Sequence, residues 1–361
     1  MVVAQGWTTP IEGVQGKDWL IVNYVDWELL GFQDYYCGTK SYDGHQGTDY
    51  VLKSFAQMDS GVYVLAADTG IVFKVLDSLF DRNKAINAGG LGNYIGIEHP
   101  GQYQAYYAHL KKASSLVNPG DTVYPGQRIA QVGSSGNSTD PHLHFEVWYD
   151  SSFVVDPFSG PCGNATTLWE NPLPYDSSFG LSHSGMLGFV PVSRDTLTEH
   201  PKGKLKFSDN IDTSITYWSL MHGLRKGDSL KIEWYTPDNL LWFDFTFYIN
   251  KDWWYYNFWS YIDFPLSNPG TWTITMSRNG DLFDSIDFDV ELNATKNVEI
   301  EKQSNLELKY YGGNIHIENV KGEYQYQLMD IQGRIIKSGI STNTLINLSS
   351  ELKDGIYLFK A

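Results

Sequence analysis

The sequence predicts an all-β protein made of successive antiparallel β domains. Aromatic residues make up 15% of the 361 residues, including 12 tryptophans and 24 tyrosines, and aromatic side chains favour strands. Short apolar runs alternate with Gly, Asn and Asp, as in strands joined by turns. The close pair Pro172 and Pro174, which cannot continue a sheet, and a composition shift near Asn297 indicate boundaries. The expected domains are residues 1–170, 171–294 and 295–361.

Composition excludes several classes of protein. The net charge of -16 disfavours nucleic acid as a partner, because nucleic acid is held mainly by Lys and Arg. The excess of acid is typical of a soluble exported protein. No apolar run reaches the length of a transmembrane segment. No signal-peptide pattern opens the chain, so we expect residues 1–4 to be what remains after processing or design.

The first domain is expected to consist of strands in a fixed order. Residues 6–28 carry few strand signals and are expected to form a lead-in. Residues 94–98 and 103–109 should pair antiparallel across Pro100 and Gly101. Turns are expected at 117–121 and 124–127. The remaining expected strands are 62–67, 71–75, 128–132 and 142–148.

The last of these strands carries the most informative pattern. Its apolar residues Leu143, Phe145 and Val147 alternate with His142, His144 and Glu146, which is the period of a strand. Two histidines at this spacing lie on one face, about 7 Å apart at their backbones. One can bind a metal while the other faces the metal's open position. The alternative is a pair of surface histidines on an edge strand.

His45 and Asp49 are the upstream candidates for metal ligands. In a straight strand they would lie about 13 Å apart, too far for one ion. We therefore expect a tight turn at Gly47 to bring them together. With His144 they give two nitrogens and one carboxylate, a catalytic zinc set that leaves a fourth position for water. Nitrogen and oxygen donors favour Zn2+ over calcium.

These motifs resemble the M23 (lysostaphin/LytM-type) zinc endopeptidases over roughly residues 44–148. Asp140 departs from the family, which commonly has a small residue there, and we expect it to alter the rim of the cleft. The resemblance rests on several motifs in the family's order: His45-x-x-x-Asp49, Gly92-Asn93-Tyr94-Ile95-Gly96-Ile97, Tyr107-Ala108-His109-Leu110, Pro119-Gly120-Asp121-x-Val123-x-x-Gly126-Gln127 and Gly136 to Glu146.

The resemblance implies a role for each site residue. The ligands of Zn2+ are His45, Asp49 and His144. His109 and His142 are the two unligated catalytic histidines, one transferring a proton and the other stabilising the oxyanion, in an order that the sequence leaves open.

Two sets of residues near or outside this site have simpler interpretations. Tyr36 or Tyr42 either adds a phenol to the oxyanion site or packs. His99 is expected at the surface in a turn. The remaining histidines are expected to be structural or solvated: His183, His200, His222 and His316.

The second domain is expected to be a β-sandwich. Its expected strands are 241–248, 271–276 and 286–290, with a hairpin turn at Arg278-Asn279-Gly280-Asp281. The aromatic run 253–259 is denser than a core strand needs. It is either a platform for a ligand or partner, or packing within the core and between domains.

The third domain is expected to be a small β-sandwich with strands at 306–308, 315–317, 324–328, 335–336 and 356–359. Residues 328–336 and 352–358 resemble the C-terminal sorting domain of the type IX secretion system of Bacteroidetes. This implies the type IX secretion machinery as a partner and a secreted or cell-surface location. The family carries a further strand after the second motif, so the tail is expected to be truncated. The alternative is an ordinary accessory β-sandwich.

Cys37 and Cys162 bracket the candidate site. Because export implies an oxidising compartment, we expect a disulfide that stabilises the domain by about 3–5 kcal/mol in the chain-entropy model. The alternative is two buried thiols.

Together these features predict a secreted zinc metalloendopeptidase that acts on peptidoglycan peptides or cross-bridges. Two alternatives remain: an extracellular protease that cuts glycine-rich proteins such as elastin, and a non-catalytic M23-like binding protein. The expected partners are therefore peptidoglycan or an extracellular protein substrate.

Overall fold

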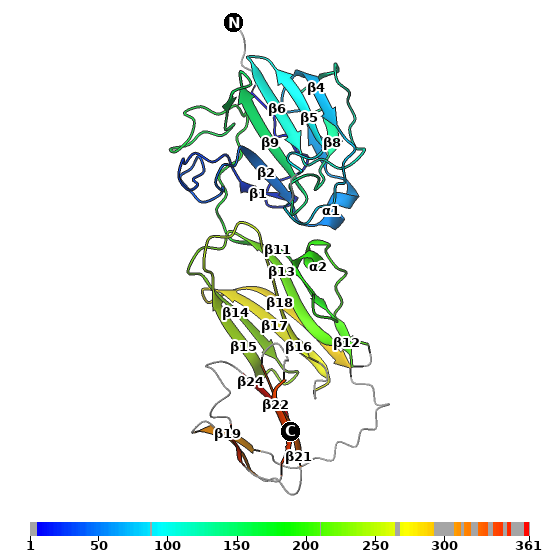
Figure 1. The fold of residues 1–361 in the computed structure, drawn as a ribbon, viewed down its shortest axis with the longest axis vertical. Helices are drawn as coiled ribbons and strands as arrows, with labels where there is room; N and C mark the ends of the chain where they lie inside the picture. Colours follow the sequence, from blue (N-terminus) through cyan, green and yellow to red (C-terminus); the bar gives the residue numbers. More distant parts are fainter. Residues whose placement is uncertain are drawn as a thin grey trace. The chain divides into compact units, whose positions relative to one another are not determined.

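The structure, a computed structural model, describes residues 6–86, 89–209, 211–263, 268–291 and six strands between 307 and 360. Its regular secondary structure is almost entirely β-strand, as the sequence predicts (Figure 1). The chain divides into two compact units, Met1–Asn293 and Ala294–Ala361. Neither helix of the described part has the length and apolar character that a membrane span requires.

The first unit begins with a large antiparallel sheet that carries the candidate site. β10 (Phe153–Val154) pairs with the end of β9 (His142–Tyr149), outside the main strand order. β3 (Tyr63–Leu65) pairs with β8 (Arg128–Gln131) in a separate two-stranded sheet. The strands expected at 94–98 and 103–109 form the antiparallel pair β5–β6. The order across the large sheet is β1 (Trp19–Asn23), β2 (Gly47–Leu52), β9 (His142–Tyr149), β6 (Tyr103–Ala108), β5 (Tyr94–His99), β4 (Gly70–Leu76) and β7 (Thr122–Val123).

The expectation that residues 6–28 form a lead-in is wrong. They contain β1, which pairs with β2 at the edge of the large sheet, and Trp7 and Ile11 lie in the core. The run Trp19–Ile21 is buried throughout. A strand covered on both faces shows no alternation of apolar and polar residues, so the periodic signal is absent there.

The core of this part of the chain lies on the apolar face of β9. Leu143, Phe145 and Val147 are completely buried, as the alternation predicts. His144 and Glu146, on the opposite face, are buried as well. The edge-strand alternative is therefore wrong, because β9 lies between β2 and β6. A buried polar face on a central strand needs partners for its polar groups.

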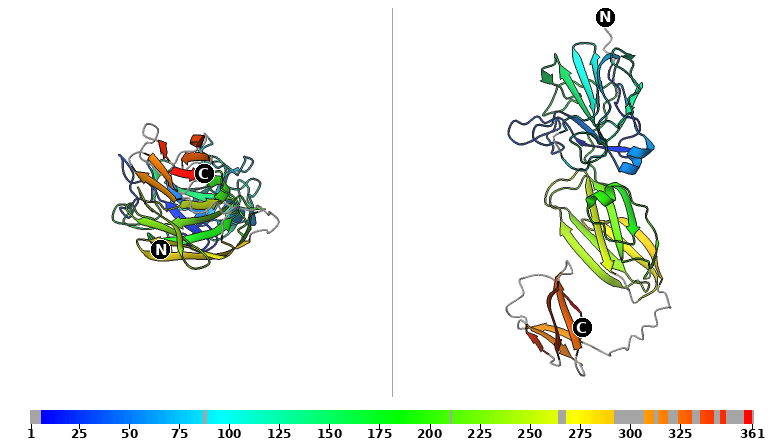
Figure 2. Two further views of the ribbon diagram at one scale, coloured as in Figure 1. Left: turned by 90° about the horizontal axis from the view of Figure 1, so that it is seen from below. Right: turned by 45° about the vertical axis from the view of Figure 1, so that its right-hand side comes forward.

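A β-sandwich follows within the same unit (Figure 2). A single core joins its two sheets, and it is separate from the core of residues 7–169. The three-stranded sheet is β11 (Gly180–Leu187), β13 (Ser214–His222) and β16 (Tyr256–Asp263). The five-stranded sheet is β12 (Lys206–Ser208), β18 (Asp281–Glu291), β17 (Gly270–Arg278), β14 (Ser229–Tyr235) and β15 (Leu241–Tyr248).

The hairpin expected at 278–281 joins β17 to β18. Asn279 and Gly280 have φ values of 53° and 92°. Positive φ at both central residues is typical of the turn that matches the twist of a two-residue hairpin. Two short helices complete the unit, α1 (Phe55–Ser60) and α2 (Arg194–Thr198).

The described strands of the second unit form two three-stranded sheets. Of the predicted sorting motifs, residues 331–334 and 352–356 lie outside the described residues. The sheets are β19 (Glu307–Tyr311), β20 (Asn314–Glu318) and β23 (Leu345–Asn347), and β22 (Ile335–Ser341), β21 (Tyr324–Asp330) and β24 (Tyr357–Lys360). The division into three domains stays a prediction.

The predicted pairing of Cys37 with Cys162 is confirmed. The two residues form a disulfide that spans 125 positions of sequence. It joins the loop between β1 and β2 to the segment after β10, so it closes the first domain around its sheet.

Candidate metal centre and its cleft

Neighbouring strands bring the predicted ligands together. Asp49 on β2 lies directly opposite His144 on β9 in the register of the sheet. His45 lies two residues before β2 begins. His142 opens β9, and His109 directly follows β6, the strand on the other side of β9. Residues almost a hundred positions apart thus meet on one face of three adjacent strands.

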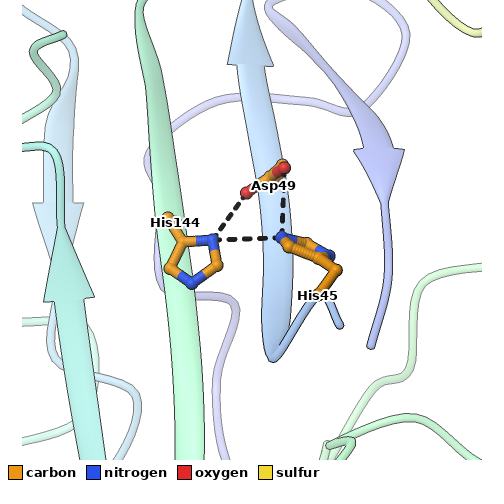
Figure 3. A group of neighbouring side chains, drawn as sticks. All are labelled: His45, Asp49 and His144. Atoms are coloured by element: carbon orange, nitrogen blue, oxygen red, sulfur yellow. Dashed lines mark hydrogen bonds and ion pairs between the residues drawn. The ribbon is translucent and has the colours of Figure 1, made fainter. Parts of the chain in front are cut away.

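Three donor atoms converge at this point (Figure 3). His144 Nδ1 lies 2.8 Å from Asp49 Oδ1 and 3.2 Å from His45 Nε2. The same His45 nitrogen lies 3.2 Å from Asp49 Oδ2. All three side chains are buried. The two nitrogens and the carboxylate therefore form one compact donor set.

The donor set fits a zinc ion. Ligands about 2.0–2.1 Å from a tetrahedral ion lie roughly 3.3 Å from one another. The observed separations of 2.8–3.2 Å are close to that value. The far nitrogen of each histidine also has an acceptor, as metal-bound imidazoles usually do. His45 Nδ1 donates to Tyr24 O at 2.7 Å, and His144 Nε2 donates to Glu146 Oε1 at 2.9 Å.

Gly47 acts differently from what the sequence analysis expects. The positive φ before the site belongs to Gly44, at 76°, whereas Gly47 is already the first residue of β2. A Cβ on Gly47 would lie 2.8 Å from His144 Cε1 and 2.8 Å from Phe145 O. The turn is therefore earlier, and Gly47 leaves space for the ring of His144.

Two supporting residues have no role in the sequence analysis. Glu146 holds the ring of His144, and Asn23 on β1 donates its amide to Asp49 Oδ2 at 2.7 Å. The alternation of β9 already places Glu146 on the same face as His142 and His144, so its signal is present in the sequence. Asn23 has no such signal, because it lies on the strand whose pattern is not periodic.

The electrostatics of the centre favour a cation. Burial would raise the pKa of Asp49, but the neighbouring imidazoles His45, His142 and His144 hold it well below its usual value. Burial would lower the pKa of His144, but Asp49 and Glu146 raise it to about 10. The carboxylates of Asp49 and Glu146 therefore stabilise positive charge at the centre, and they would stabilise a bound divalent cation in the same way.

His109 and His142 lie beside the donor set. Their ring centroids are 4.6 Å apart, and His142 Nε2 lies 3.6 Å from Asp49 Oδ1. His109 Nδ1 donates to Ser135 O and His142 Nδ1 donates to Asp140 O, each at 2.8 Å. With Nδ1 as the donor, Nε2 is the nitrogen of each ring that can accept a proton. Burial, with the charges of His142 and His144, lowers the pKa of His109 well below its usual value.

The backbone at His109 is held in an unusual conformation. Its φ of 59° lies in the left-handed region, which non-glycine residues seldom adopt. The His109 amide donates to Leu91 O at 2.9 Å. The glycines Gly92 and Gly136 allow the two loops that contain them to approach closely, since a Cβ on Gly136 would lie 2.4 Å from Gly92 N. These loops therefore fix where the imidazole of His109 lies.

The centre opens into a cleft of about 530 Å³. Asp49, His109 and His142 line it from the first domain, and so does Tyr42. Its other walls include the loop 137–140 and three residues of the β-sandwich, which are Arg194, Trp253 and Tyr255. The volume is within the range of about 300–1,000 Å³ that small-ligand sites occupy.

The structure separates the two tyrosine candidates. The Tyr42 ring lies 4.5 Å from the His45 ring and lines the cleft. Tyr36 stacks on Tyr175 with ring centroids 4.7 Å apart. Tyr42 is 51% exposed, but partial desolvation of its phenol, with the charges of Asp49 and Glu146, raises its pKa, so the phenol keeps its proton at neutral pH.

The expectation that His99 lies at the surface is wrong. It is only 3% exposed, and its ring packs 4.7 Å from the ring of Trp7. Its Nδ1 donates to Thr69 O at 2.9 Å. A histidine before Pro-Gly can end a strand with its ring turned to the core, and the contacts with Trp7 and Thr69 hold the His99 ring on that side.

Comparison with known proteins supports a peptidase. Residues 43–157 match the family model Peptidase family M23. The chain is 36% identical over 102 residues to the peptidoglycan DD-endopeptidase ShyC of Vibrio cholerae, covering 28% of this chain and 19% of the relative. It is 35% identical over 142 residues to lysostaphin of Staphylococcus staphylolyticus, covering 39% of this chain and 24% of the relative.

Among solved structures, the chain matches the catalytic domain of lysostaphin from Staphylococcus simulans. The identity is 29%, the match covers 35% of this chain and 85% of that chain, and the TM-score is 0.25. The chain spans about a fifth to a quarter of the length of the curated relatives described above. The family model and the relatives support the M23 peptidase family for the segment that carries the site.

Proposed function

We propose that the protein is a secreted zinc metalloendopeptidase that hydrolyses peptide bonds in peptidoglycan peptides or cross-bridges. One observation carries the proposal. His45, Asp49 and His144 converge within 3.2 Å on a buried centre, with the free nitrogens of His109 and His142 beside it. A non-catalytic binding protein would not need these two further histidines.

The chemistry follows from these residues. Zn2+, when held by His45, Asp49 and His144, supplies a Lewis acid that makes water a nucleophile near neutral pH and polarises the scissile carbonyl. Nε2 of His142 or His109 accepts a proton from the attacking water and returns it to the leaving amine. The other imidazole, in its doubly protonated form, and the Tyr42 phenol donate to the developing oxyanion.

The substrate is proposed from the relatives. ShyC is named for cleavage of peptidoglycan, and lysostaphin matches over a longer segment. The disulfide supports an oxidising compartment outside the cytoplasm. The type IX secretion machinery is proposed as the export partner on the two C-terminal sequence motifs alone.

Three substrates test the proposal. The purified chain is loaded with one equivalent of zinc and incubated with peptidoglycan sacculi, a pentaglycine peptide and elastin. Release of new amino termini from sacculi, abolished by a chelator and restored by zinc, supports the proposal. Cleavage of elastin but not of sacculi would identify the glycine-rich protein alternative. Failure to bind zinc and to cleave any of the three would leave only a binding protein.

A further inference from the structure

The β-sandwich after residue 170 contributes directly to the cleft of the metal centre. Three of its residues line the same hollow as Asp49, His109 and His142: Arg194 from α2, and Trp253 and Tyr255 from the segment before β16. The matched family segment ends at residue 157, so these three residues lie outside it. The cleft is therefore larger than the peptidase segment alone provides.

Specific contacts hold the sandwich against the rim of the cleft. Arg194 forms an ion pair with Asp140, the residue that departs from the family pattern. The backbone oxygen of Asp140 accepts the hydrogen bond from His142 Nδ1. The ion pair thus ties the sandwich to the loop that orients His142.

The aromatic run supplies further contacts beside the cleft. The Tyr255 phenol donates to Leu52 O at 3.4 Å and Lys53 O at 3.3 Å, just after β2. Trp254 is buried, and its indole donates to Thr39 O at 3.0 Å. These two side chains serve packing between the domains, which was one of the two interpretations of the run.

Trp253 is half-buried and lines the cleft, as Tyr255 does, whereas Trp254 is buried and does not. Tyr255 is bonded to the end of β2, and no such bond is present for Trp253 among the described residues. Within the same part of the chain, no hydrogen bond or ring contact joins Trp253 to the five site residues.

Two contacts of the Trp253 ring lie within the sandwich. The Tyr256 ring is 5.3 Å away, and Lys251 Nζ lies 4.2 Å from the centroid of the Trp253 ring. The Trp253 backbone is fixed by bonds in both directions with Leu224, at 3.0 and 2.8 Å. A rigidly held aromatic face that borders a catalytic cleft is suited to binding a ligand.

We propose that Trp253 is a substrate-binding residue, and that it contacts the peptide at positions away from the scissile bond. This inference rests on the proposed peptidase function. The occupant is an extended peptide that packs against the part of Trp253 that lines the cleft, beside Lys251, while its scissile carbonyl lies at the metal centre. The sandwich is then a part of the active site, and substrate recognition is shared between two domains.

Substrate length tests this inference. The full chain and its Trp253→Ala variant, both loaded with zinc, are assayed on glycine peptides from the shortest that is cleaved up to hexaglycine, and on a cross-linked muropeptide. We expect kcat/KM to fall about tenfold or more on the longest substrates, mainly through KM, and to change little on the shortest. A Trp253→Phe variant should recover most of the loss, because it restores an aromatic face.

Trp242→Ala is the matched control. Trp242 is a half-exposed tryptophan of the same sandwich, on β15, and it does not line the cleft. It should leave kcat/KM unchanged on every substrate. Equal losses at all peptide lengths, or a Trp253→Ala enzyme that matches the wild type, would overturn the inference.

Binding separates this inference from the proposed function. The affinity of hexaglycine and of the muropeptide for the zinc-loaded wild type and for Trp253→Ala is measured by titration calorimetry. If the substitution weakens binding but the chain hydrolyses neither ligand, the peptidase function is refuted and the role of Trp253 stands. If the chain hydrolyses the ligands and the substitution changes neither binding nor hydrolysis, the peptidase function stands and the role of Trp253 is refuted. A wild type that neither binds nor hydrolyses the ligands would refute both proposals.

Discussion

At the scale of residues, the centre is built in two layers. His45, Asp49 and His144 form the inner layer, and each is held by a partner that carries no ligand atom of its own. For His144 this partner is Glu146. Burial would raise the pKa of Glu146, but the neighbouring imidazole of His144 lowers it. Such outer partners fix the tautomer and orientation of a metal ligand.

Substitution of four of the five site residues should separate metal binding from catalysis. Asp49→Ala or His144→Ala should lose zinc and activity together, because each removes a donor atom. His109→Ala and His142→Ala should keep zinc and lose turnover by about a hundredfold or more. Zinc per chain is measured by mass spectrometry beside kcat. Full activity of His142→Ala would show that the division into ligands and catalytic groups is wrong.

Gly47→Ala should damage the centre without removing any donor. The new methyl group would lie within about 3 Å of the His144 ring, at 2.8 Å from Cε1 and 2.9 Å from Nε2, so the ring has to shift. We expect weaker zinc binding and lower activity in a folded protein. Gly203→Ala is the control, since its Cβ would meet nothing closer than 3.5 Å. Equal zinc affinity of both variants would contradict the spatial role of Gly47.

Asp156 should make stability depend on pH. Burial and the charge of Asp34 raise the pKa of Asp156 to about 7, against about 3.9 in an unfolded chain. Between these values the folded protein keeps a proton that the unfolded chain releases. Its contribution to the free energy of unfolding is therefore fully present below pH 4 and is lost as the pH rises to 7.

Asp156→Asn removes this contribution. Relative to the variant, the wild type should lose free energy of unfolding as the pH rises from 4.5 to 7.5. Above that range the difference between the two proteins should be constant. Urea unfolding at several pH values measures it, and the other carboxyl groups cancel in the difference. A difference that does not vary with pH would show that Asp156 titrates normally.

At the scale of elements, three adjacent strands and one covalent link assemble the centre. The register between β2 and β9 places Asp49 opposite His144, and the register between β9 and β6 places Ala108 opposite the same histidine. A slip of one residue would turn the ligands to the other face. The disulfide anchors the long loop that runs from β1 to β2 and ends at His45.

Removal of the disulfide should therefore reduce stability and leave the chemistry intact. A Cys37→Ser and Cys162→Ser double variant should lose about 3–5 kcal/mol of free energy of unfolding in the chain-entropy model. At a temperature where it stays folded, its kcat per bound zinc should equal that of the wild type. Thermal melting and zinc-normalised kinetics decide this, and an unchanged melting temperature would remove the structural role.

At the scale of the whole molecule, the candidate site lies within one of the two units. All five site residues and every residue that lines the cleft belong to the unit Met1–Asn293. This unit holds two separate cores, and the contacts of Arg194, Trp254 and Tyr255 join them. Catalysis should accordingly depend on both β domains of the first unit.

A chain of residues 1–293 should keep the complete activity. We expect its zinc content, melting temperature and kcat/KM on a glycine peptide to equal those of the full chain, because the site lies within one compact unit. The full chain, purified in parallel, is the reference. A large loss of kcat/KM with unchanged zinc would assign residues 294–361 a part in the site.

The sequence by itself determined that the chain is built of antiparallel strands, because period-2 patterns and turn residues mark strands such as β5, β6 and β9 and the hairpin at 278–281. The disulfide followed from the only two cysteines in a chain expected to be exported, and the grouping of His45, Asp49 and His144 followed from their motifs. The sequence did not indicate β1, because a strand buried on both faces has no alternation. Only the tertiary structure decided that Gly47 makes space for His144, that His99 turns to the core, and that Trp253 reaches the cleft. Each of these depends on a contact with a distant segment, and residue spacing carries no information about such contacts.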